Sequence, residues 1–272
     1  PNTLEFLTEY GVFLAKAITI VVALMIILGT IVSVGTRSKK GPDGHIEVTH
    51  LNKEFEAMTE AIKSVALDKV VLKPESKAHK KQEKLDKKDR AKVEKEGGHQ
   101  KRVYVLNFEG DIKASAVASL REEITSVLTV AQKEDEVIVR LSSSGGMVHT
   151  YGLASSQMQR VCDKQIPLTV CVDKVAASGG YMMACIADKI VAAPFAILGS
   201  IGVVAQLPNF NRLLKKHDVD FELMTAGEYK RTLTLFGENT DKGREKFKEE
   251  LEDTHDLFKS FVSEHRPELN ID

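Results

Sequence analysis

One serine stands where the chain turns from an apolar strand into a stretch of helix-forming residues. Ser178 follows the strand predicted over 168–172 and precedes Gly179, Gly180 and an apolar segment over 181–187, which we expect to be a buried helix. A serine at a helix N-terminus lies beside unpaired N–H groups, which favour an anionic reaction intermediate. The same pattern also fits a serine that only caps the helix in a tight turn.

A glycine pair follows the strand predicted over 136–141. The loop over 142–146 reads Ser-Ser-Ser-Gly-Gly, and a loop of this kind can turn its N–H groups toward a ligand. Backbone donors held in this way stabilise an oxyanion. The loop therefore supplies a candidate oxyanion hole at Gly145 and Gly146.

Lys230 is the candidate base. It follows a strand predicted over 219–224, and the neighbouring side chains that can bury it are those of Thr232, Leu233, Leu235 and Phe236. Burial disfavours the charged ammonium form, so a buried lysine loses its proton more readily. Its neutral amine can then act as a general base.

Together these motifs resemble the S49 family of membrane-bound serine peptidases, the signal peptide peptidase A and SohB group. The resemblance covers most of the chain. It implies that Ser178 is the nucleophile and that Lys230, about fifty residues later, is the base. It also implies that the N–H groups of Gly146 and Gly179 form the oxyanion hole.

The resemblance assigns supporting roles as well. Gly145 lies in the oxyanion-hole loop, and Ser200, in a segment that also matches the family, would hold the lysine amine in position. The family usually has proline where this chain has Ser144, a difference that bears on the stiffness of the loop. Family members continue beyond Asp272, and this chain begins without methionine, so we expect it to be a trimmed portion of a longer protein.

Strand and helix patterns alternate from Arg102 onward, which predicts an α/β fold with a largely parallel sheet. Catalytic loops then lie beyond the carboxyl ends of the strands. The resemblance implies the ClpP/crotonase-type fold, built from repeated strand-helix units. The expected strands are 103–108, 136–141, 168–172, short strands around Ile190 and Val203, and 219–224; the expected helices are 114–131, 149–161, the segment after Ser178, 209–216 and 241–264.

An apolar segment precedes this domain. Residues 12–34 are nearly uncharged and long enough to cross a hydrocarbon core of roughly 30 Å. A basic cluster follows at 37–40 and two acids precede the segment, which reverses the charge order of a cleaved signal peptide. We expect residues 1–40 to be a single-pass transmembrane helix in a bacterial inner (plasma) membrane. The charge asymmetry favours a cytoplasmic catalytic domain, with a periplasmic one as the alternative.

Residues 41–101 are expected to hold an amphipathic helix and a lysine-rich linker. The apolar residues that recur at steps of four and three are Leu51, Phe55, Met58, Ile62 and Val65. They share one helix face, which would pack on its own domain or against another subunit. The linker interleaves acids with its lysines and lacks aromatic residues, so nucleic acid is not an expected partner, whereas anionic lipid headgroups are.

Residues 102–272 form the predicted S49 catalytic domain. Cys162, Cys171 and Cys185 lack metal-ligand spacing and are expected to be buried free thiols. The sequence carries no Cys/His cluster, phosphate loop or dinucleotide fingerprint, so we expect neither a metal nor another cofactor.

The resemblance implies a membrane-anchored serine endopeptidase that forms homo-oligomers and degrades signal peptides or other membrane-associated peptides. A Ser-His-acid triad is the chemical rival, with His149, His217 or His255 as its base. A crotonase-type acyl-CoA enzyme would share the fold without needing Ser178 or Lys230. A catalytically inactive membrane scaffold is the third alternative.

Overall fold

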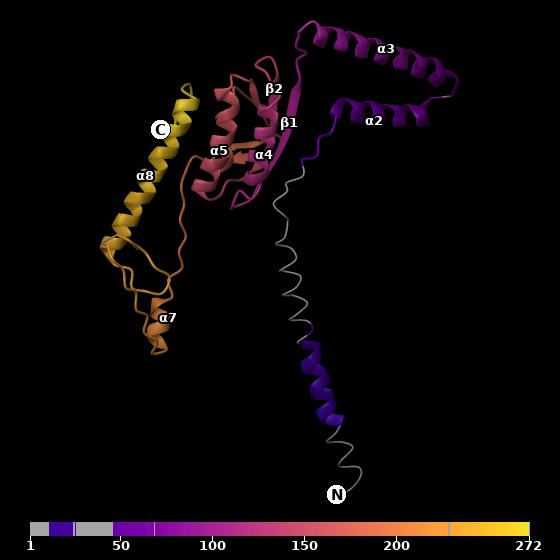
Figure 1. The fold of residues 1–272 in the computed structure, drawn as a ribbon. Helices are drawn as coiled ribbons and strands as arrows, with labels where there is room; N and C mark the ends of the chain where they lie inside the picture. Colours follow the sequence, from indigo (N-terminus) through magenta and orange to yellow (C-terminus); the bar gives the residue numbers. More distant parts are fainter. Residues whose placement is uncertain (1–10, 24, 26–45, 68, 228, 272) are drawn as a thin grey trace. The chain divides into compact units, whose positions relative to one another are not determined.

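The computed structural model describes residues 11–23, 25, 46–67, 69–227 and 229–271 (Figure 1). The chain divides into two compact units, residues 1–49 and residues 50–272. Residues 11–23 of the first unit are helical. Among the described residues, no helix combines the length and the apolar character needed to cross a membrane. Most of the anchor expected within residues 1–40 lies outside the described ranges and stays a prediction.

Two exposed helices begin the second unit, α2 (Leu51–Ala66) and α3 (Lys69–Lys95). They confirm the helix predicted from the four-and-three spacing and extend helical structure into the lysine-rich segment. No residue of α2 is buried, and Ile62 on its apolar stripe is 70% exposed. The expectation that this stripe packs on its own domain is therefore wrong for the described chain, because no described segment covers it.

A parallel sheet of six strands organises the rest of the described chain (Figure 1). Its order is β5-β3-β2-β4-β6, and β1 pairs with β2. Every strand pair is parallel, which confirms the predicted α/β class. The strands are β1 (Val103–Gly110), β2 (Glu136–Ser143), β3 (Leu168–Val172), β4 (Val175–Ala177), β5 (Lys189–Ala192) and β6 (Ile197–Gly199).

Strand β2 changes partner along its length. Residues Val137 to Arg140 pair with β3, whereas Ser143 pairs with Ala176 of β4. Strand β3 therefore ends beside the middle of β2, and β4 takes its place beside the end. This exchange carries the residue after β4, Ser178, next to the loop after β2.

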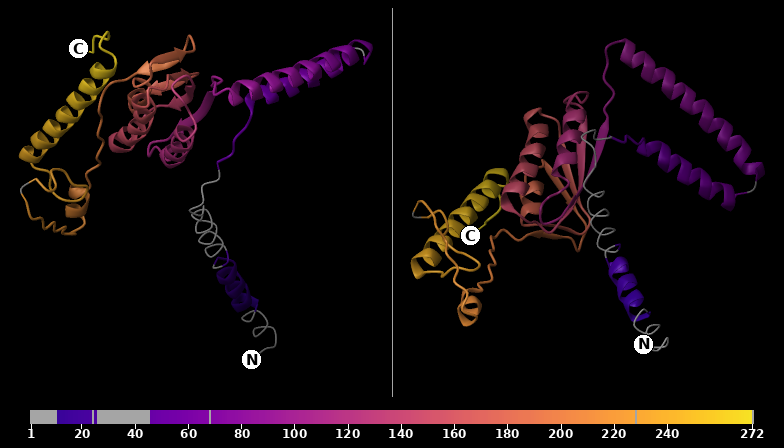
Figure 2. Two further views of the ribbon diagram at one scale, coloured as in Figure 1. Left: turned by 45° about the horizontal axis from the view of Figure 1, so that its top comes forward. Right: turned by 60° about the horizontal axis from the view of Figure 1, so that its bottom comes forward.

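Helices α4 (Val117–Leu128), α5 (Val148–Asp163), α6 (Gly179–Ala184) and α8 (Asp241–His265) contribute buried side chains to the core around the sheet. The short helix α7 (Asn211–Lys216) buries no residue. Helices α4 and α5 pack against each other, and α5 also contacts α6 (Figure 2). The largest side chains that they and the sheet bury completely include Phe108, Leu120, Ile124, Tyr151, Met158, Leu168 and Met183. Burying one such side chain contributes about 1.5–3 kcal/mol.

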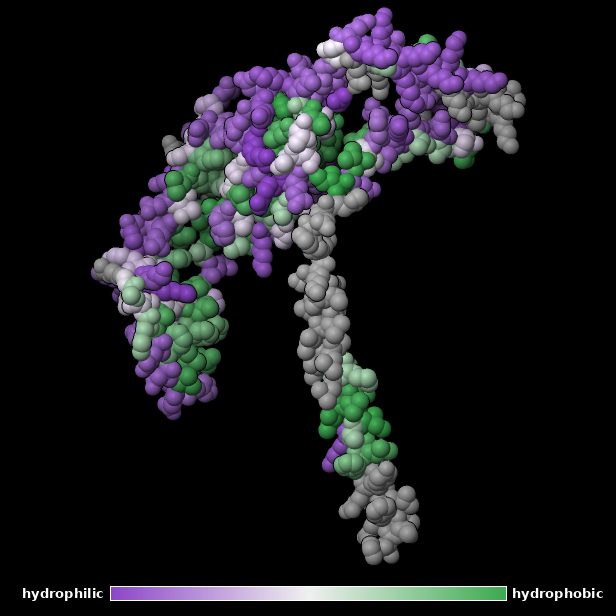
Figure 3. Space-filling view, viewed as in Figure 1, coloured by the Kyte–Doolittle hydropathy of each residue, from purple (hydrophilic) through white to green (hydrophobic). Residues whose placement is uncertain are grey.

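The segment after β6 departs from the prediction. The strands expected around Val203 and over 219–224 are absent, and these residues have no regular structure. Val204 is 80% exposed and Met224 is 86% exposed, and hydrophobic side chains lie at the surface of this part of the chain (Figure 3). A strand forms only where a neighbouring strand shares its hydrogen bonds, and no strand among the described residues pairs with either segment.

The cysteines are free thiols, as expected, but only one of them is buried as predicted. All three are free thiols; Cys185 is buried, and Cys162 and Cys171 are half-buried. Burial raises the pKa of Cys185 to about 12. Burial, reinforced by the charges of Asp188 and Asp163, raises the pKa of Cys162 to about 11. Neither of these two thiols presents a reactive thiolate at neutral pH.

Asp135 ties the segment after α3 to the turn before β2. Its carboxylate is fully buried. It accepts hydrogen bonds from the N–H groups of Gln132 at 2.9 Å and Arg102 at 2.6 Å, and it lies 2.7 Å from His99 Nε2. Burial alone would raise the pKa of Asp135, but the bonds from Gln132, His99 and Arg102 together outweigh it and lower the pKa below its usual value.

We expect Asp135→Asn to lower the free energy of unfolding by about 2–3 kcal/mol at pH 7, because an amide cannot accept from all three donors. In the wild type, the unfolded chain takes up a proton at Asp135 before the folded chain does. The contribution of Asp135 is therefore complete above about pH 5 and declines as the pH falls toward its lowered folded pKa. Denaturant unfolding across this range measures both effects. Glu134→Gln, at an exposed neighbouring position, is the control and should change stability by less than about 0.5 kcal/mol.

Candidate active site

Ser178 occupies a sharp turn between β4 and α6. Its backbone has φ 52° and ψ −121°, a conformation that residues other than glycine rarely adopt and that costs about 1–3 kcal/mol. The turn is held by the bond from Ser178 N–H to Gly199 O at 2.7 Å and by that from Met182 N–H to Ser178 O at 2.9 Å. The Ser178 side chain makes no capping hydrogen bond to α6. A simple capping role therefore does not explain this serine, whereas strained strand-to-helix turns are typical of nucleophiles.

The loop after β2 lies directly against this turn. Gly145 has φ +89°, and a Cβ atom placed on it would lie 2.7 Å from both Gly179 N and Ser178 Cβ. No side chain fits in that space, since real Cβ atoms do not approach other atoms so closely. The structure thus brings Gly145, Ser178 and Gly179 together as the sequence predicted.

Two backbone N–H groups are the candidate oxyanion donors, one in the residue after Ser178 and one in the residue after Gly145. Gly179 is the first residue of α6, where a helix leaves its N–H without an internal partner. Gly146 is exposed, and its N–H donates to no other group among the described residues. Its position is fixed by the neighbouring bond from Met147 N–H to Ile112 O at 2.8 Å. Neither of the two glycines predicted to form an oxyanion hole therefore donates its N–H to another backbone group among the described residues, and of the two Gly146 is exposed and Gly179 is buried.

Ser200 also lies beside the nucleophile candidate. Ala177 pairs with Gly199 in the sheet, so the next residues of the two strands, Ser178 and Ser200, are neighbours. Both have a positive φ, which is 54° at Ser200. Ser200 is exposed.

Lys230 is placed differently from the prediction. It is exposed, in a series of turns where its N–H donates to Gly227 O at 3.3 Å. The expected cover is not formed, because Phe236 packs instead against Phe210 and Phe221, with ring centroids 6.0 and 5.7 Å apart. The prediction of a buried Lys230 is therefore wrong for the described chain.

The three histidines considered as alternative bases do not take the place of Lys230 beside Ser178. His149 lies exposed in the first turn of α5, and His217 is exposed at the end of α7. His255 places its Nε2 3.2 Å from Ile201 O. None of them hydrogen-bonds Ser178 in the part of the chain that the structure describes.

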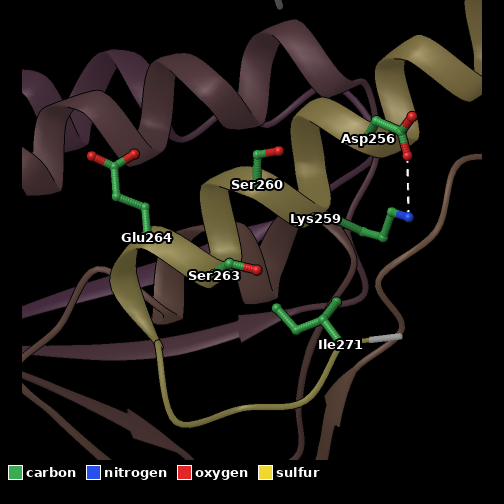
Figure 4. A pocket seen from close by; sticks show the side chains of 6 residues that line it. All are labelled: Asp256, Lys259, Ser260, Ser263, Glu264 and Ile271. Atoms are coloured by element: carbon green, nitrogen blue, oxygen red, sulfur yellow. Dashed lines mark ion pairs between the residues drawn. The ribbon is translucent and has the colours of Figure 1, made fainter.

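Away from Ser178, hollows lie along α8 and between α2 and α3. A hollow of about 760 Å³ runs along α8, lined by Asp256, Lys259, Ser260, Ser263, Glu264 and Ile271 (Figure 4). Lys259 and Asp256 pair with each other at 3.1 Å. No group of three or more His, Cys, Asp or Glu residues within the described ranges could hold a metal ion.

Two positions beside the site were not anticipated from the sequence. Tyr151, fully buried on α5, lies against Gly179, because a Cβ on that glycine would strike its ring. Ser143, the last residue of β2, is buried under the same turn. A signal was present in the tyrosine within the helix predicted over 149–161: a tyrosine hydroxyl that becomes buried needs a hydrogen-bond partner.

Comparison with known proteins decides the family. The model of the peptidase family S49 N-terminal region matches residues 5–158, and that of peptidase family S49 matches residues 160–272. This chain belongs to peptidase family S49. The resemblance seen in the sequence motifs is thereby confirmed. The two matches meet inside α5, so their junction is not a boundary between folded units.

Individual S49 relatives agree over almost the whole chain. A Haemophilus influenzae protein named Probable protease SohB is 53% identical over 277 residues, which covers 98% of this chain and 77% of the relative. A protein of the same name from Buchnera aphidicola subsp. Schlechtendalia chinensis is 47% identical over 278 residues and covers 99% and 90%. An enoyl-CoA hydratase/isomerase family structure from Silicibacter pomeroyi has a TM-score of 0.30 and 13% identity, and the match covers 36% of this chain and 50% of the other. A likeness that weak carries no argument.

We expect Gly145→Ala to reduce covalent labelling of Ser178 by a fluorophosphonate by roughly a hundredfold, since the new methyl group would push the two loops apart. Gly152→Ala is the matched control. Gly152 lies within α5, and a Cβ there meets nothing within 4 Å. It should label like the wild type and be more stable by about 0.5–1 kcal/mol. Equal labelling of both variants would show that the close approach at Gly145 is not needed.

Proposed function

We propose that this S49 peptidase is a serine endopeptidase with Ser178 as its nucleophile and Lys230 as its base. The observation that carries the proposal is the strained turn at Ser178, packed against the loop at Gly145, with the N–H groups of Gly146 and Gly179 donating to no other backbone group among the described residues. An activated hydroxyl next to two backbone donors is the arrangement that acyl transfer needs.

The proposed reaction begins as the neutral Lys230 amine takes the Ser178 proton while Oγ attacks the scissile carbonyl carbon. The carbonyl electrons move to its oxygen, and the N–H groups of Gly146 and Gly179 stabilise the resulting oxyanion. Collapse breaks the C–N bond, and the leaving amine takes the proton from Lys230. Water then gives a proton to Lys230 as it attacks the acyl ester. Collapse breaks the ester C–O bond, and Lys230 returns the proton to Ser178 Oγ, which restores both residues. Ser200 would hold the amine in position.

The dyad requires Lys230 to leave its exposed position and reach Ser178. Homo-oligomerisation would supply a cover for the segment that carries it. This is supported by the apolar side chains exposed on β5, β6 and the residues after them, which are Val191, Phe195, Ile197, Leu198 and Val204. A second copy seated on these side chains would remove them from water, a change that favours association.

The proposal extends to the setting of the enzyme. We propose a single-pass anchor within residues 1–40, a bacterial inner membrane, and signal peptides or other membrane-associated peptides as substrates. We further propose the ClpP/crotonase-type arrangement for the catalytic domain. The apolar run and the basic cluster over 37–40 support the anchor, and the names of the relatives support proteolysis.

A second candidate function is an inactive membrane scaffold of the same fold. The exposure of Lys230 favours it, because a serine without a neighbouring base is a poor nucleophile.

Activity-based labelling separates the two candidates. A fluorophosphonate should modify wild-type protein at Ser178, found by peptide mapping. Ser178→Ala and Lys230→Ala should each lower peptide hydrolysis by roughly a thousandfold or more. Lys230→Arg should not restore it, because a guanidinium stays protonated. His149→Ala is the control and should keep most activity. Turnover retained in Lys230→Ala but lost in His149→Ala would restore the histidine triad, and an unlabelled Ser178 in the wild type would support the scaffold.

The proposed topology places the catalytic domain in the cytoplasm. In intact spheroplasts, we expect an externally added protease to leave residues 102–272 undigested, since the basic cluster after the anchor keeps that side inside. Lysis with detergent should expose the domain to the same protease. Digestion in intact spheroplasts would place the domain in the periplasm.

A further inference from the structure

The hydroxyl of Tyr151 links the end of β2 to the loop after β1. It is 2.6 Å from Ser143 Oγ and 2.7 Å from the carbonyl oxygen of Asp111. Ser143 Oγ in turn accepts a hydrogen bond from Gly145 N–H at 3.1 Å. The tyrosine and the serine are both buried, so water does not compete for these bonds.

The proton positions in this set follow from its chemistry. A carbonyl oxygen only accepts, so Tyr151 gives its single proton to Asp111 O. Ser143 must then donate its proton to the Tyr151 oxygen, and its own oxygen receives Gly145 N–H. Burial raises the pKa of Tyr151 above its usual value, so the hydroxyl stays protonated across the neutral range. The result is a chain of three hydrogen bonds, here called the relay, in which each group donates to the next: Gly145 to Ser143, Ser143 to Tyr151, and Tyr151 to Asp111.

Each end of the relay reaches a proposed oxyanion donor. At one end, Ser143 fixes the backbone of Gly145, the residue before Gly146. At the other end, Asp111 precedes Ile112, whose carbonyl oxygen binds Met147 N–H at 2.8 Å on the other side of Gly146. The ring of Tyr151 packs against Gly179, which carries the second donor, and stands edge-on to Phe108 with centroids 6.5 Å apart.

We propose that Tyr151 and Ser143 are positioning residues that set the spacing of the Gly146 and Gly179 donors. This inference rests on the proposed serine peptidase mechanism. Neither side chain touches the reacting atoms; they act through the backbone of the loop after β2. A displacement of about 1 Å in such donors can lower the rate roughly a hundredfold.

Tyr151→Phe is the sharpest test, because it removes the hydroxyl and keeps the ring on Gly179 and Phe108. With a fluorogenic peptide carrying alanine before the cleaved bond, we expect kcat to fall about tenfold to a hundredfold and KM to change less than about threefold. The pH profile of kcat should keep its shape, since the relay transfers no proton in the reaction. Ser143→Ala should give a similar loss. The double variant should be no worse than the poorer single one, because both changes break the same relay.

Tyr104→Phe removes a hydroxyl from a partly buried tyrosine on β1 and serves as the control, with unchanged kinetics. A glycine-labelled NMR spectrum of the full chain gives a readout that needs no activity: the amide signals of Gly145, Gly146 and Gly179 should shift in Tyr151→Phe and stay in place in Tyr104→Phe. Glycine signals that do not move would overturn the inference whether or not the wild type is active. An active wild type whose Tyr151→Phe variant keeps kcat within twofold would also overturn it, and would leave the proposed function standing.

Discussion

Two backbone turns approach each other so closely that only glycine fits between them, and the rest of the site depends on this contact. Gly145 leaves no room for a Cβ beside Ser178 and Gly179, and a Cβ on Gly180 would lie 2.5 Å from Ser143 O. A side chain at any of these glycines would separate the loops. Their separation would also move the N–H groups of Gly146 and Gly179 away from a common target. Close packing of this backbone is thus the condition for the proposed oxyanion hole.

Strand pairing and helix burial on either side of Ser178 explain how a strained serine persists. A positive φ at Ser178 is unfavourable, and the three residues of β4 are too few to hold the turn by themselves. The neighbouring strands and helix α6 stabilise the turn instead. Strand β4 pairs with β2 on one side and β6 on the other, and every residue of α6 is buried. The turn is therefore held from both ends by structure whose stability comes from core packing, while the Ser178 side chain makes no capping bond.

The sequence predicted the parts of the chain in which local pattern and tertiary packing agree. Apolar runs such as 136–141 became central strands, and Ser178 and the glycine loop met beyond their ends, because parallel strands align their carboxyl ends. Strand β4 was missed, since a three-residue strand depends on its partners and carries almost no periodic signal. The run over 219–224 has strand-like residues but no partner, so it formed no strand. The prediction of a buried Lys230 was wrong for a related reason. The apolar residues near it in sequence indicated burial, but Phe236 packs against Phe210 and Phe221 and does not cover the lysine.

The two halves of the proposed site therefore depend on different physics. The donor half is held by buried backbone, by the Tyr151 relay and by the strand exchange at β2, all within one chain. The base half lies on a segment with little burial. The mechanism requires Lys230 to be desolvated, because burial favours its neutral amine. If only a fraction of molecules place the amine at Ser178, the apparent rate falls to that fraction of its full value, while the oxyanion donors stay in position. Under the proposed mechanism, the fold of one chain sets the strength of oxyanion stabilisation. The cover over the Lys230 segment, proposed to be a second copy of the chain, sets the fraction of molecules in which the lysine amine reaches Ser178.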